Sequence, residues 1–395
     1  MKSVQRKILV PVLAMAFSGA IVLSTSFDTP ALAATSSAPG WLGSLGSVGE
    51  PSDDTSYAAV AQRINAVLAQ QGIPGAQVVY ADNGTERAFN YGVSSVATGD
   101  SVDSDTVFEA ASLTKVVASY VVLQLVDEGV LDLDRPLSDY FDYPRIAADP
   151  AAGRITGRMV LTHTSGLPNW ATGPSSPEFE TTPVGTIFEP GTQWSYSGEG
   201  FYYLQKTVES LTGKPFQQLV RERVFDRFGM TGSDLVTNPA FGAVTSVGHT
   251  ADGTPKPVRN FPRANIAYTL RTTALDYNRF LRGALLDGDG LTPATRDMMF
   301  TATGSADHGG SDKESIEHIK WGLGIGLQSN ELGDAIWHWG DNGPYKAFFI
   351  AYPETGRSVV IMTNSEDGLN AVDGIVHEFF GPSTIYATRW IKEAE

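Results

Sequence analysis

A serine and a lysine stand three residues apart in the segment EAASLTKVVA, which covers residues 109–118. On a helix, residues three apart lie on one face with their β-carbons about 5–6 Å apart, so Ser112 and Lys115 would point the same way. A lysine among apolar neighbours loses affinity for its proton and can accept one from a serine hydroxyl. The backbone N–H of a serine at a helix start is unpaired, and the helix dipole there favours negative charge. The pair therefore suits nucleophilic attack on a carbonyl group.

This spacing alone does not distinguish a catalytic pair from an ordinary amphipathic helix, because one Ser-x-x-Lys match in 395 residues is expected by chance. Other nucleophiles are easier to exclude. The chain contains no cysteine, so it has no thiolate nucleophile, no disulfide and no cysteine-ligated metal site. No Gly-x-Ser-x-Gly segment occurs, which argues against the nucleophile elbow of α/β-hydrolases.

Motifs for metals and cofactors are incomplete. The histidines show no metal-ligand spacing, and Asp287–Gly290 lacks the remaining ligands of a calcium loop. Gly322, Gly324 and Gly326 do not form a Gly-x-Gly-x-x-Gly dinucleotide loop, because no glycine stands at the third position of that motif. Their segment is typical of a strand. His163 is interpreted as a residue that fixes its loop by hydrogen bonding rather than as a catalyst. We therefore expect no metal and no cofactor.

Two patterns near the start of the chain predict regular structure. Apolar residues recur at helical spacing over residues 56–71, and residues 72–75 (GIPG) end that helix. The runs AQVVYAD and TERAFNYGV flank Asn83-Gly84, which is the strongest short-range signal for a β-hairpin. A helix followed by a hairpin is therefore expected.

The segment that holds Ser112 continues as a predicted helix, with an apolar face inward, to Glu128, where Gly129 ends it. From about 130 to 300 helical segments dominate, including FYYLQKTVESLTG and PFQQLVRERVFDRFG, with loops rich in proline and glycine between them. The polar stretch 303–318 is interpreted as a plain surface loop, with a mobile lid as the alternative.

After residue 320 the pattern returns to strands. Four strand-like runs and a last helix follow one another: WGLGIGLQ, AIWHWG, YKAFFIAY, RSVVIMTN and then LNAVDGIVHEFFG. A hairpin near the N-terminus and a three- or four-strand meander near the C-terminus thus flank a mostly helical middle. This order predicts an α+β fold in which one antiparallel sheet is assembled from both ends of the chain, covered by terminal helices, with an inserted helical lobe.

The N-terminus has the pattern of an export signal. Three basic residues precede the apolar run ILVPVLAMAFSGAIVL, and Ala31-Leu32-Ala33 follows. This order indicates a secretory signal peptide over residues 1–33, cleaved near Ala33, rather than a membrane anchor. Residues 34–54 are rich in Ser, Gly and Pro and are expected to be a flexible lead-in. Residues 55–385 are expected to form one domain, with its helical lobe at about 130–300, in a secreted or periplasmic protein without a membrane span.

The chain is acidic, with a net charge of −16. The charge becomes more negative after cleavage, because the predicted signal peptide carries three basic residues and one acidic residue. Strong acidity argues against nucleic acid or an anionic membrane as the main partner. The expected partner is a small-molecule or peptide substrate, and the oligomeric state is left open.

Four blocks of sequence in a fixed order carry a resemblance: FEAASLTKVVASYVVLQLVDEGVLDLDRPLSDYF, LTHTSGLPNW, WSYSGEGFYYLQKTVESLTGKPFQQLVRERVFDRFGMTGSDL and HWGDNGPYKAFFIAYPETGRSVVIMTN. They resemble the class C β-lactamase-like serine hydrolases, a superfamily that includes penicillin-binding DD-peptidases, D-aminopeptidases and carboxylesterases. The blocks span roughly residues 55–380. The resemblance implies a β-lactamase/DD-peptidase-like fold and a hydrolase that forms a covalent acyl-enzyme without a cofactor.

The resemblance also implies roles for individual residues. Ser112 is expected to be the acyl-accepting nucleophile, with Lys115 as its activator. Tyr196 matches the tyrosine of the family's Tyr-x-Asn motif, and either Lys115 or Tyr196 is expected to take the serine proton. His338-Trp339-Gly340 matches the third motif, which is Lys-x-Gly or His-x-Gly in relatives and lies on a strand beside the nucleophile. The backbone N–H groups of Ser112 and Asp341 are expected to form the oxyanion hole.

Departures from the family pattern bear on the substrate. The family has Asn two residues after the tyrosine, where this chain has Gly198, followed by Glu199. The chain therefore lacks the asparagine that helps hold a substrate's amide side chain in relatives with β-lactamase activity. In the third motif, His338 is mostly neutral at pH 7 and replaces a lysine. Asp341 stands where a small hydroxyl residue is common, and its carboxylate is expected to repel an anionic substrate end. Lys320-Trp321-Gly322 also fits Lys-x-Gly, but it opens the preceding strand and is not taken as the third motif.

The expected activity is that of an esterase or of a D-amino-acid amidase or peptidase. The alternative activity is that of a β-lactamase or a D-Ala-D-Ala carboxypeptidase, that is, a penicillin-binding protein. From a different class, a non-catalytic cell-wall-binding or sensor protein with the same fold remains an alternative because the motif's Asn is missing.

Overall fold

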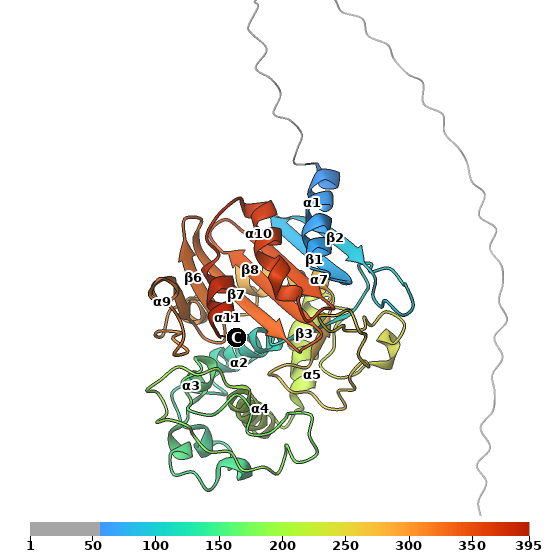
Figure 1. The fold of residues 1–395 in the computed structure, drawn as a ribbon. Coiled ribbons are helices and arrows are strands. Elements are labelled where there is room, and N and C mark those ends of the chain that lie inside the picture. The colour runs from blue at the N-terminus through green and yellow to red at the C-terminus, as the bar shows by residue number, and fades with distance from the viewer. Residues whose placement is uncertain (1–55, 395) are drawn as a thin grey trace, which may run out of the picture. The chain divides into compact units, whose positions relative to one another are not determined.

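The computed structural model describes residues 56–394. The predicted signal peptide (residues 1–33) and lead-in (34–54) lie outside these residues. Within them, a seven-stranded antiparallel sheet has the order β2-β1-β9-β8-β7-β6-β5 (Figure 1). The N-terminal hairpin pairs with the last strand of the chain, which confirms the prediction of one sheet assembled from both ends.

The N-terminal elements follow the sequence pattern. The Ser56 hydroxyl accepts a hydrogen bond from the Ala59 amide at 3.2 Å and caps the first helix. Asn83 and Gly84 both have positive φ, as a tight type I′ turn requires. The predicted helix and hairpin are thereby confirmed. They are α1 (Tyr57–Gln70), β1 (Gly75–Asp82) and β2 (Thr85–Gly92).

The C-terminal meander has five strands in the described part of the chain, where three or four were expected. The run WGLGIGLQ is not one strand, because the chain turns between Trp321 and Gly326. Gly324 in this turn has φ +75, and a β-carbon there would overlap the Ser119 hydroxyl. Close packing of a turn therefore explains this glycine. The strands are β5 (Ile319–Trp321), β6 (Gly326–Asn330), β7 (Gly333–Asp341), β8 (Lys346–Tyr352) and β9 (Arg357–Thr363).

Helices from both ends of the chain cover one face of the sheet (Figure 1). They are α1, α10 (Val372–Phe380) and α11 (Tyr386–Ala394). The sequence predicted the first two but not α11. Trp390 of α11 is buried, and its ring centre lies 5.6 Å from that of Trp337 and 5.4 Å from that of Trp339. The last helix is therefore part of the core.

The opposite face carries α2 (Leu113–Asp127), for which the sequence predicted one inward apolar face. Every residue from Leu113 to Leu125 is buried, because the helix is enclosed between the sheet and the helical middle of the chain. A polar side chain on such a helix must find partners inside the protein. This requirement applies directly to Lys115.

Short helices and long loops make up the middle of the chain, and two further strands form a small separate sheet. The two helical segments singled out in the sequence are present as α4 and as α5–α6, with a π-helical turn inside the second. The elements are β3 (Phe108–Ala111), β4 (Leu270–Thr272), α3 (Gly157–Leu161), α4 (Gly198–Thr212), α5 (Phe216–Val220), α6 (Asp226–Phe228), α7 (Ala274–Phe280) and α8 (Pro293–Met299).

The polar stretch 303–318 contains a helix, α9 (Lys313–His318), and is fastened to α11. The Ser315 hydroxyl donates a hydrogen bond to Glu393 at 2.9 Å, and Arg389 pairs with Glu314 at 2.5 Å. The sequence interpretation as a plain loop missed this helix. Among residues 56–394, no helix is both long and apolar enough to cross a bilayer.

Candidate active site

Ser112 lies where β3 ends and α2 begins. Ala111, directly before it, has φ +48, a conformation that costs a non-glycine residue roughly 1–3 kcal/mol and clusters at functional sites. The Thr114 hydroxyl donates a hydrogen bond to the Ala111 carbonyl at 2.5 Å, which holds this sharp turn from strand to helix. Like other amides at a helix start, that of Ser112 has no hydrogen-bond acceptor in the described part of the chain.

Lys115 points from the first turn of α2 toward Ser112. Its Nζ lies 3.2 Å from Ser112 Oγ and donates a hydrogen bond to the Ala267 carbonyl at 2.8 Å. The side chain is 1% exposed, and this burial lowers the pKa of Lys115 well below its ordinary value. Burial therefore favours the neutral form of the amine that stands beside the serine hydroxyl.

Tyr196 reaches the same place from the residues just before α4. The Nζ of Lys115 lies 4.5 Å from the centre of its ring. Burial raises the pKa of the Tyr196 hydroxyl above its ordinary value, and a weaker interaction with Ser112 acts in the opposite direction. The hydroxyl forms no hydrogen bond of ordinary geometry within residues 56–394, so its contact with Ser112 is long or bent. Tyr196 is a protonated phenol at neutral pH.

Strand β7 passes close to Ser112 because Gly340 has no side chain. A β-carbon at Gly340 would overlap the Ala110 carbonyl oxygen in β3 and would lie 3.1 Å from the β-carbon of Ala111. Glycine is therefore required here for the contact between β7 and the end of β3. This contact sets the position of the next residue, Asp341, relative to Ser112.

The amide of Asp341 faces away from β8. The Asn342 amide donates to the Tyr345 carbonyl at 3.1 Å, and hydrogen-bonded positions alternate along an antiparallel pair. Asp341 stands opposite Lys346, so its amide points to the other edge of β7. Strand β6 pairs with β7 only as far as Trp337, which leaves this edge open toward the site. The amides of Ser112 and Asp341 are thus both available to an oxygen in the pocket.

His338 lies behind the pocket and does not line it. Its side chain is fully buried, and its Nδ1 donates to the Trp339 carbonyl at 2.7 Å. Burial lowers the pKa of His338 to about 3, with a smaller effect from nearby Lys115. The ring is therefore neutral at pH 7 and supplies no cation to a substrate.

His163 fixes its loop. It has φ +56, and its Nδ1 accepts a hydrogen bond from the Ser197 amide at 3.1 Å. Its carbonyl accepts another from the Ser195 amide at 2.8 Å. These bonds hold the segment that carries Tyr196, in the way that the sequence interpretation proposed.

The charge of the Asp341 carboxylate is offset by an ion pair with a lysine, contrary to expectation. One oxygen lies 2.7 Å from the Nζ of Lys346, and the other accepts a hydrogen bond from the Gly343 amide at 2.7 Å. The two side chains meet because Asp341 and Lys346 are partners across β7 and β8. The expectation that this carboxylate would repel an anionic substrate end is therefore corrected.

Arg259 brings a cation to the pocket wall that sequence reasoning missed. Its guanidinium pairs with Glu109 and donates to the Asn342 carbonyl at 3.0 Å. Glu109 is also paired with Arg271 at 3.4 Å, so two guanidinium groups share one carboxylate. The pairing joins residues 150 positions apart, and no local motif signals it.

Glu199 points away from the pocket. It forms a buried ion pair with Arg145, with two N–O separations of 2.8 and 2.9 Å, and accepts a hydrogen bond from the Ala171 amide at 3.1 Å. Glu199 therefore anchors the loop of residues 169–171 to the start of α4. That loop carries Trp170, a ring of the pocket wall that the sequence did not predict.

Trp170 fills the space beside Gly198. A β-carbon on residue 198 would overlap the indole ring of Trp170. The place where the resembling family carries an asparagine side chain is thus taken by an aromatic ring from another segment. The signal available in the sequence was the tryptophan that ends the block LTHTSGLPNW.

One cavity of about 620 Å³ brings these groups together. Ser112, Lys115, Tyr196 and Asp341 line it, whereas His338 and Gly340 do not. Lining residues to which sequence reasoning gave no role include Asn169, Trp170, Arg259, Tyr268, Trp339 and Asn342. Within residues 56–394, no group of three or more His, Asp or Glu side chains is arranged to hold a metal ion.

A family model described as Beta-lactamase matches residues 60–376. Penicillin-binding protein 4 of Amycolatopsis lactamdurans is 27% identical over 81% of this chain and 88% of that protein. Lovastatin esterase of Penicillium rubens is 31% identical over 50% of this chain, and the alignment covers 59% of the esterase.

Solved structures of other proteins share this fold. A class C beta-lactamase superposes with a TM-score of 0.70 over 83% of this chain and 96% of the other, at 19% sequence identity. At this identity the likeness concerns the fold alone. The expected α+β architecture with a β-lactamase/DD-peptidase-like arrangement is confirmed.

Proposed function

The chain belongs to the beta-lactamase family of serine hydrolases, and from that membership we propose that it hydrolyses carboxylic esters through a covalent acyl-enzyme on Ser112. The observation that carries this proposal is the 3.2 Å separation between Ser112 Oγ and the Nζ of buried Lys115. A lysine kept neutral by burial beside a hydroxyl is a base paired with a nucleophile.

In the acylation step, Ser112 Oγ attacks the carbonyl carbon of the ester and its proton passes to Lys115 Nζ. Lys115 is a better proton acceptor than Tyr196, because the pKa of Lys115 is lowered whereas the phenol of Tyr196 keeps its proton. The carbonyl oxygen gains negative charge and is stabilised by the amides of Ser112 and Asp341. Loss of one such donor typically costs about 3–4 kcal/mol of transition-state stabilisation.

Collapse of the tetrahedral intermediate breaks the bond to the alcohol. The leaving oxygen takes the Tyr196 proton, and Tyr196 recovers a proton from protonated Lys115, whose Nζ lies 4.5 Å from its ring centre. In deacylation a water molecule attacks the acyl carbon, gives one proton to Lys115 and displaces Ser112, which is reprotonated. The net reaction converts an ester and water into an acid and an alcohol.

Neutral esters fit the pocket better than substrates that the family holds through an asparagine and a lysine. The neutral state of His338 supplies no cation in the third motif, and Trp170 takes the place of a side chain at residue 198. The aromatic walls of Trp170 and Trp339 favour apolar groups. Amides of D-amino acids are the next substrates that the same chemistry would cleave.

A second candidate function rests on Arg259. Its guanidinium lines the pocket, and its only carboxylate partner in the described residues is shared with Arg271. An available positive charge there would suit the carboxylate of a penicillin or of a D-Ala-D-Ala terminus. The relative named penicillin-binding protein 4 agrees with this alternative.

We further propose that the protein is exported, so that the substrate is met in the periplasm or outside the cell. The basis is the basic, apolar and small-residue order of residues 1–33. Determination of the N-terminal residue of the protein recovered from culture medium or periplasm would locate the cleavage site. A start at residue 34 is expected.

The first prediction tests the nucleophile. Ser112→Ala should lower kcat/KM for p-nitrophenyl acetate about 10³-fold or more, because removal of a nucleophile leaves only residual binding and oxyanion effects. Ser101→Ala, which changes an exposed serine, is the matched control and should retain activity. Retained ester hydrolysis in Ser112→Ala would refute the assignment.

Nitrocefin and p-nitrophenyl acetate, compared on wild type and on Arg259→Ala, separate the two candidate functions. Turnover of the acetate ester with little nitrocefin turnover supports the esterase. Rapid nitrocefin turnover that is lost in Arg259→Ala would instead favour the second candidate.

A further inference from the structure

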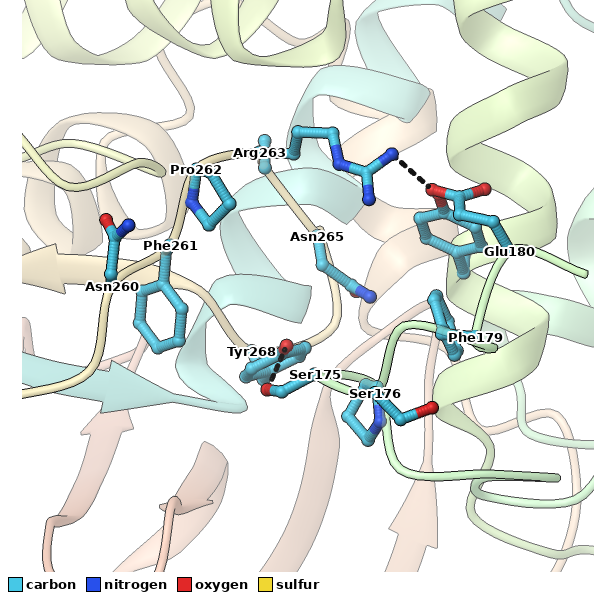
Figure 2. A pocket seen from close by; sticks show the side chains of 13 residues that line it. Ser175, Ser176, Phe179, Glu180, Asn260, Phe261, Pro262, Arg263, Asn265 and Tyr268 are labelled. Carbon is cyan, nitrogen blue, oxygen red and sulfur yellow. Dashed lines mark hydrogen bonds and ion pairs between the residues drawn. The ribbon is translucent and has the colours of Figure 1, made fainter.

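A second cavity of about 260 Å³ adjoins the catalytic pocket, and the two share Pro174, Ser175, Ser176 and Tyr268 in their walls. We propose that this side pocket (Figure 2) binds the arm of the substrate that lies farthest from the reacting carbonyl. The arm is an apolar or aromatic group that carries a neutral carbonyl. This inference rests on the proposed ester hydrolysis and names the substrate class more closely.

Tyr268 forms the wall between the two cavities. Its ring packs edge-on against Trp170 of the catalytic pocket at 5.8 Å and against Phe261 of the side pocket at 5.6 Å. Its hydroxyl lies 3.4 Å from the Ser175 hydroxyl on the facing loop, a contact that Figure 2 shows as a dashed line. A substrate arm longer than an acetyl group would pass this wall to reach the second cavity.

Buried aromatic rings line the side pocket. Phe179 and Phe261 are both buried, and Phe179 packs against Tyr202 with ring centres 4.8 Å apart. Flat apolar walls of this kind favour an aromatic or alkyl group.

Asn265 supplies a hydrogen-bond donor that no protein group uses. Its side-chain oxygen accepts a hydrogen bond from the Ala267 amide at 3.0 Å, which fixes the orientation of its amide group. The amide nitrogen then points into the cavity between Phe179 and Tyr268 (Figure 2). The residue is 5% exposed, and in the described part of the chain this nitrogen has no acceptor. A substrate carbonyl would provide one.

The charges at the rim cancel. Arg263 pairs with Glu180 at 3.1 Å, and Glu180 also accepts a hydrogen bond from the Tyr202 hydroxyl. With no net charge at the rim, a neutral carbonyl fits the Asn265 donor better than a carboxylate, whose desolvation would go uncompensated.

The same segment connects the side pocket to the catalytic group. Ala267, whose amide holds the Asn265 side chain, accepts the hydrogen bond from Lys115 through its carbonyl. An arm bound at Asn265 therefore lies on the segment that also positions the base.

Matched pairs of esters test the inference. In the acyl arm, p-nitrophenyl esters of N-benzoylglycine and of 4-phenylbutanoic acid have equal chain length, but only the first carries a carbonyl in the arm. In the alcohol arm, the acetates of N-(2-hydroxyethyl)benzamide and of 4-phenylbutanol form the same comparison. The wild type should prefer the carbonyl-bearing ester about tenfold in one of the two arms, as a buried donor left unpaired costs about that factor. The arm that shows it identifies the side of the ester that enters the pocket.

Two variants test whether the preference for the carbonyl-bearing ester arises in the side pocket. Asn265→Asp keeps the acceptor for the Ala267 amide and removes the donor, so the ratio of kcat/KM within the pair should fall to about one. Ala264→Phe, which fills the cavity, should lower kcat/KM for both long-arm esters relative to kcat/KM for p-nitrophenyl acetate in the same variant. Ala151→Phe, at a residue that lines neither cavity, is the control for introducing a ring. No preference in either arm of the wild type, or a preference that survives Asn265→Asp, would overturn the inference.

Binding of N-benzoylglycinamide to Ser112→Ala, followed by calorimetry, reports on the side pocket without catalysis. Binding that weakens about tenfold in Ser112→Ala/Asn265→Asp supports the pocket even if no ester is turned over, in which case only the proposed function fails. Ester turnover without such binding, and without the preference above, leaves the proposed function standing and refutes the side pocket.

Discussion

Lys115 has two oxygen neighbours, the Ser112 hydroxyl and the Ala267 carbonyl, on a helix that is buried on all sides. Burial is the cause of its lowered pKa. The same desolvation that makes the amine a base makes it costly to the fold, because the unfolded chain binds a proton that the folded chain does not. The proposed catalytic role of Lys115 and the stability of the fold are therefore opposed at this residue.

Lys115→Met should reveal that cost. Unfolded lysine binds its proton below about pH 10.5, whereas the folded residue binds it only below its lowered pKa, so wild-type stability decreases as pH falls from 10.5 toward the lowered pKa. Relative to wild type, the free energy of unfolding of Lys115→Met should rise by about 1.4 kcal/mol for each unit by which pH falls within this window. Urea unfolding of both proteins at pH 10, 9, 8 and 7 measures the difference, and ester hydrolysis should be lost in the variant. A difference that does not change with pH would mean that Lys115 is charged in the fold.

Trp170 and Gly198 should be energetically coupled. Alanine in a helix is normally better than glycine by about 1 kcal/mol, but Gly198→Ala should destabilise because the new β-carbon overlaps the Trp170 ring. Trp170→Ala removes that obstacle. The double variant should therefore be more stable than the sum of the single effects predicts, by about 1–2 kcal/mol. Thermal or urea unfolding of the four proteins gives the coupling, and additive effects would contradict it.

At the scale of elements, the site depends on three chain segments that meet at one point. Strand β3 delivers Ser112 through the turn at Ala111, β7 passes beside it, and the segment before α4 carries Tyr196. The approach of β7 to β3 is permitted by a single glycine. A substitution at Gly340 that moves β7 away from β3 should therefore affect catalysis as well as stability.

The variant Gly340→Ala tests whether the close contact between β7 and β3 is needed for activity. The added methyl group must push β7 away from the Ala110 carbonyl, and overpacking of this kind costs about 1–3 kcal/mol. Because the Asp341 amide moves with the strand, kcat for p-nitrophenyl acetate should fall about tenfold or more. Gly153→Ala is the matched control, since a β-carbon there has open space and the backbone has no positive φ. Full activity in Gly340→Ala would show that the amide of Asp341 does not bind the oxyanion.

Local signals predicted the elements well and their contacts poorly. Asn83-Gly84 was sufficient for the hairpin, and the alternation of β-rich runs was sufficient for a sheet drawn from both ends of the chain. The turn at Gly324 was missed because apolar residues continue through it. Helix α11 was missed because it follows a proline and glycine stretch at the very end of the chain.

The side chains that shape the pocket were harder to predict. Ser112 and Lys115 share one helical turn, so their proximity follows from spacing. The neutralisation of Asp341 by Lys346 depends on strand register. The contact of Trp170 with residue 198 and the pairing of Arg259 with Glu109 join distant segments, and only the complete fold brings them together.

At the scale of the whole molecule, buried neutral histidines tie stability to pH. Burial lowers the pKa of His338 to about 3 and lowers that of His163 well below its ordinary value. Both gain a proton on unfolding below about pH 6.5, so stability is lost as pH falls from 6.5 toward the lowered pKa of each ring. The protein should therefore be sensitive to acid.

His338→Gln should reduce that sensitivity. Between pH 6.5 and about 3, His338 contributes about 1.4 kcal/mol of lost stability for each unit by which pH falls. The variant should lose less stability than wild type over this range, whereas above pH 7 the difference between the two proteins should be constant. Urea unfolding at pH 8, 7, 6 and 5 measures both regions. Parallel curves throughout would contradict a neutral buried His338.

The sheet that joins both ends of the chain also sets the order of folding during synthesis. Strand β1 pairs with β2 on one side and with β9 on the other, so its second edge stays open until residues 357–363 have been made. Pairing across so long a separation is slow, and an open strand edge recruits other chains. In a nascent chain this edge of β1 would therefore stay unpaired until residues 357–363 have emerged. That delay would suit the proposed export, in which the polypeptide crosses a membrane before it folds.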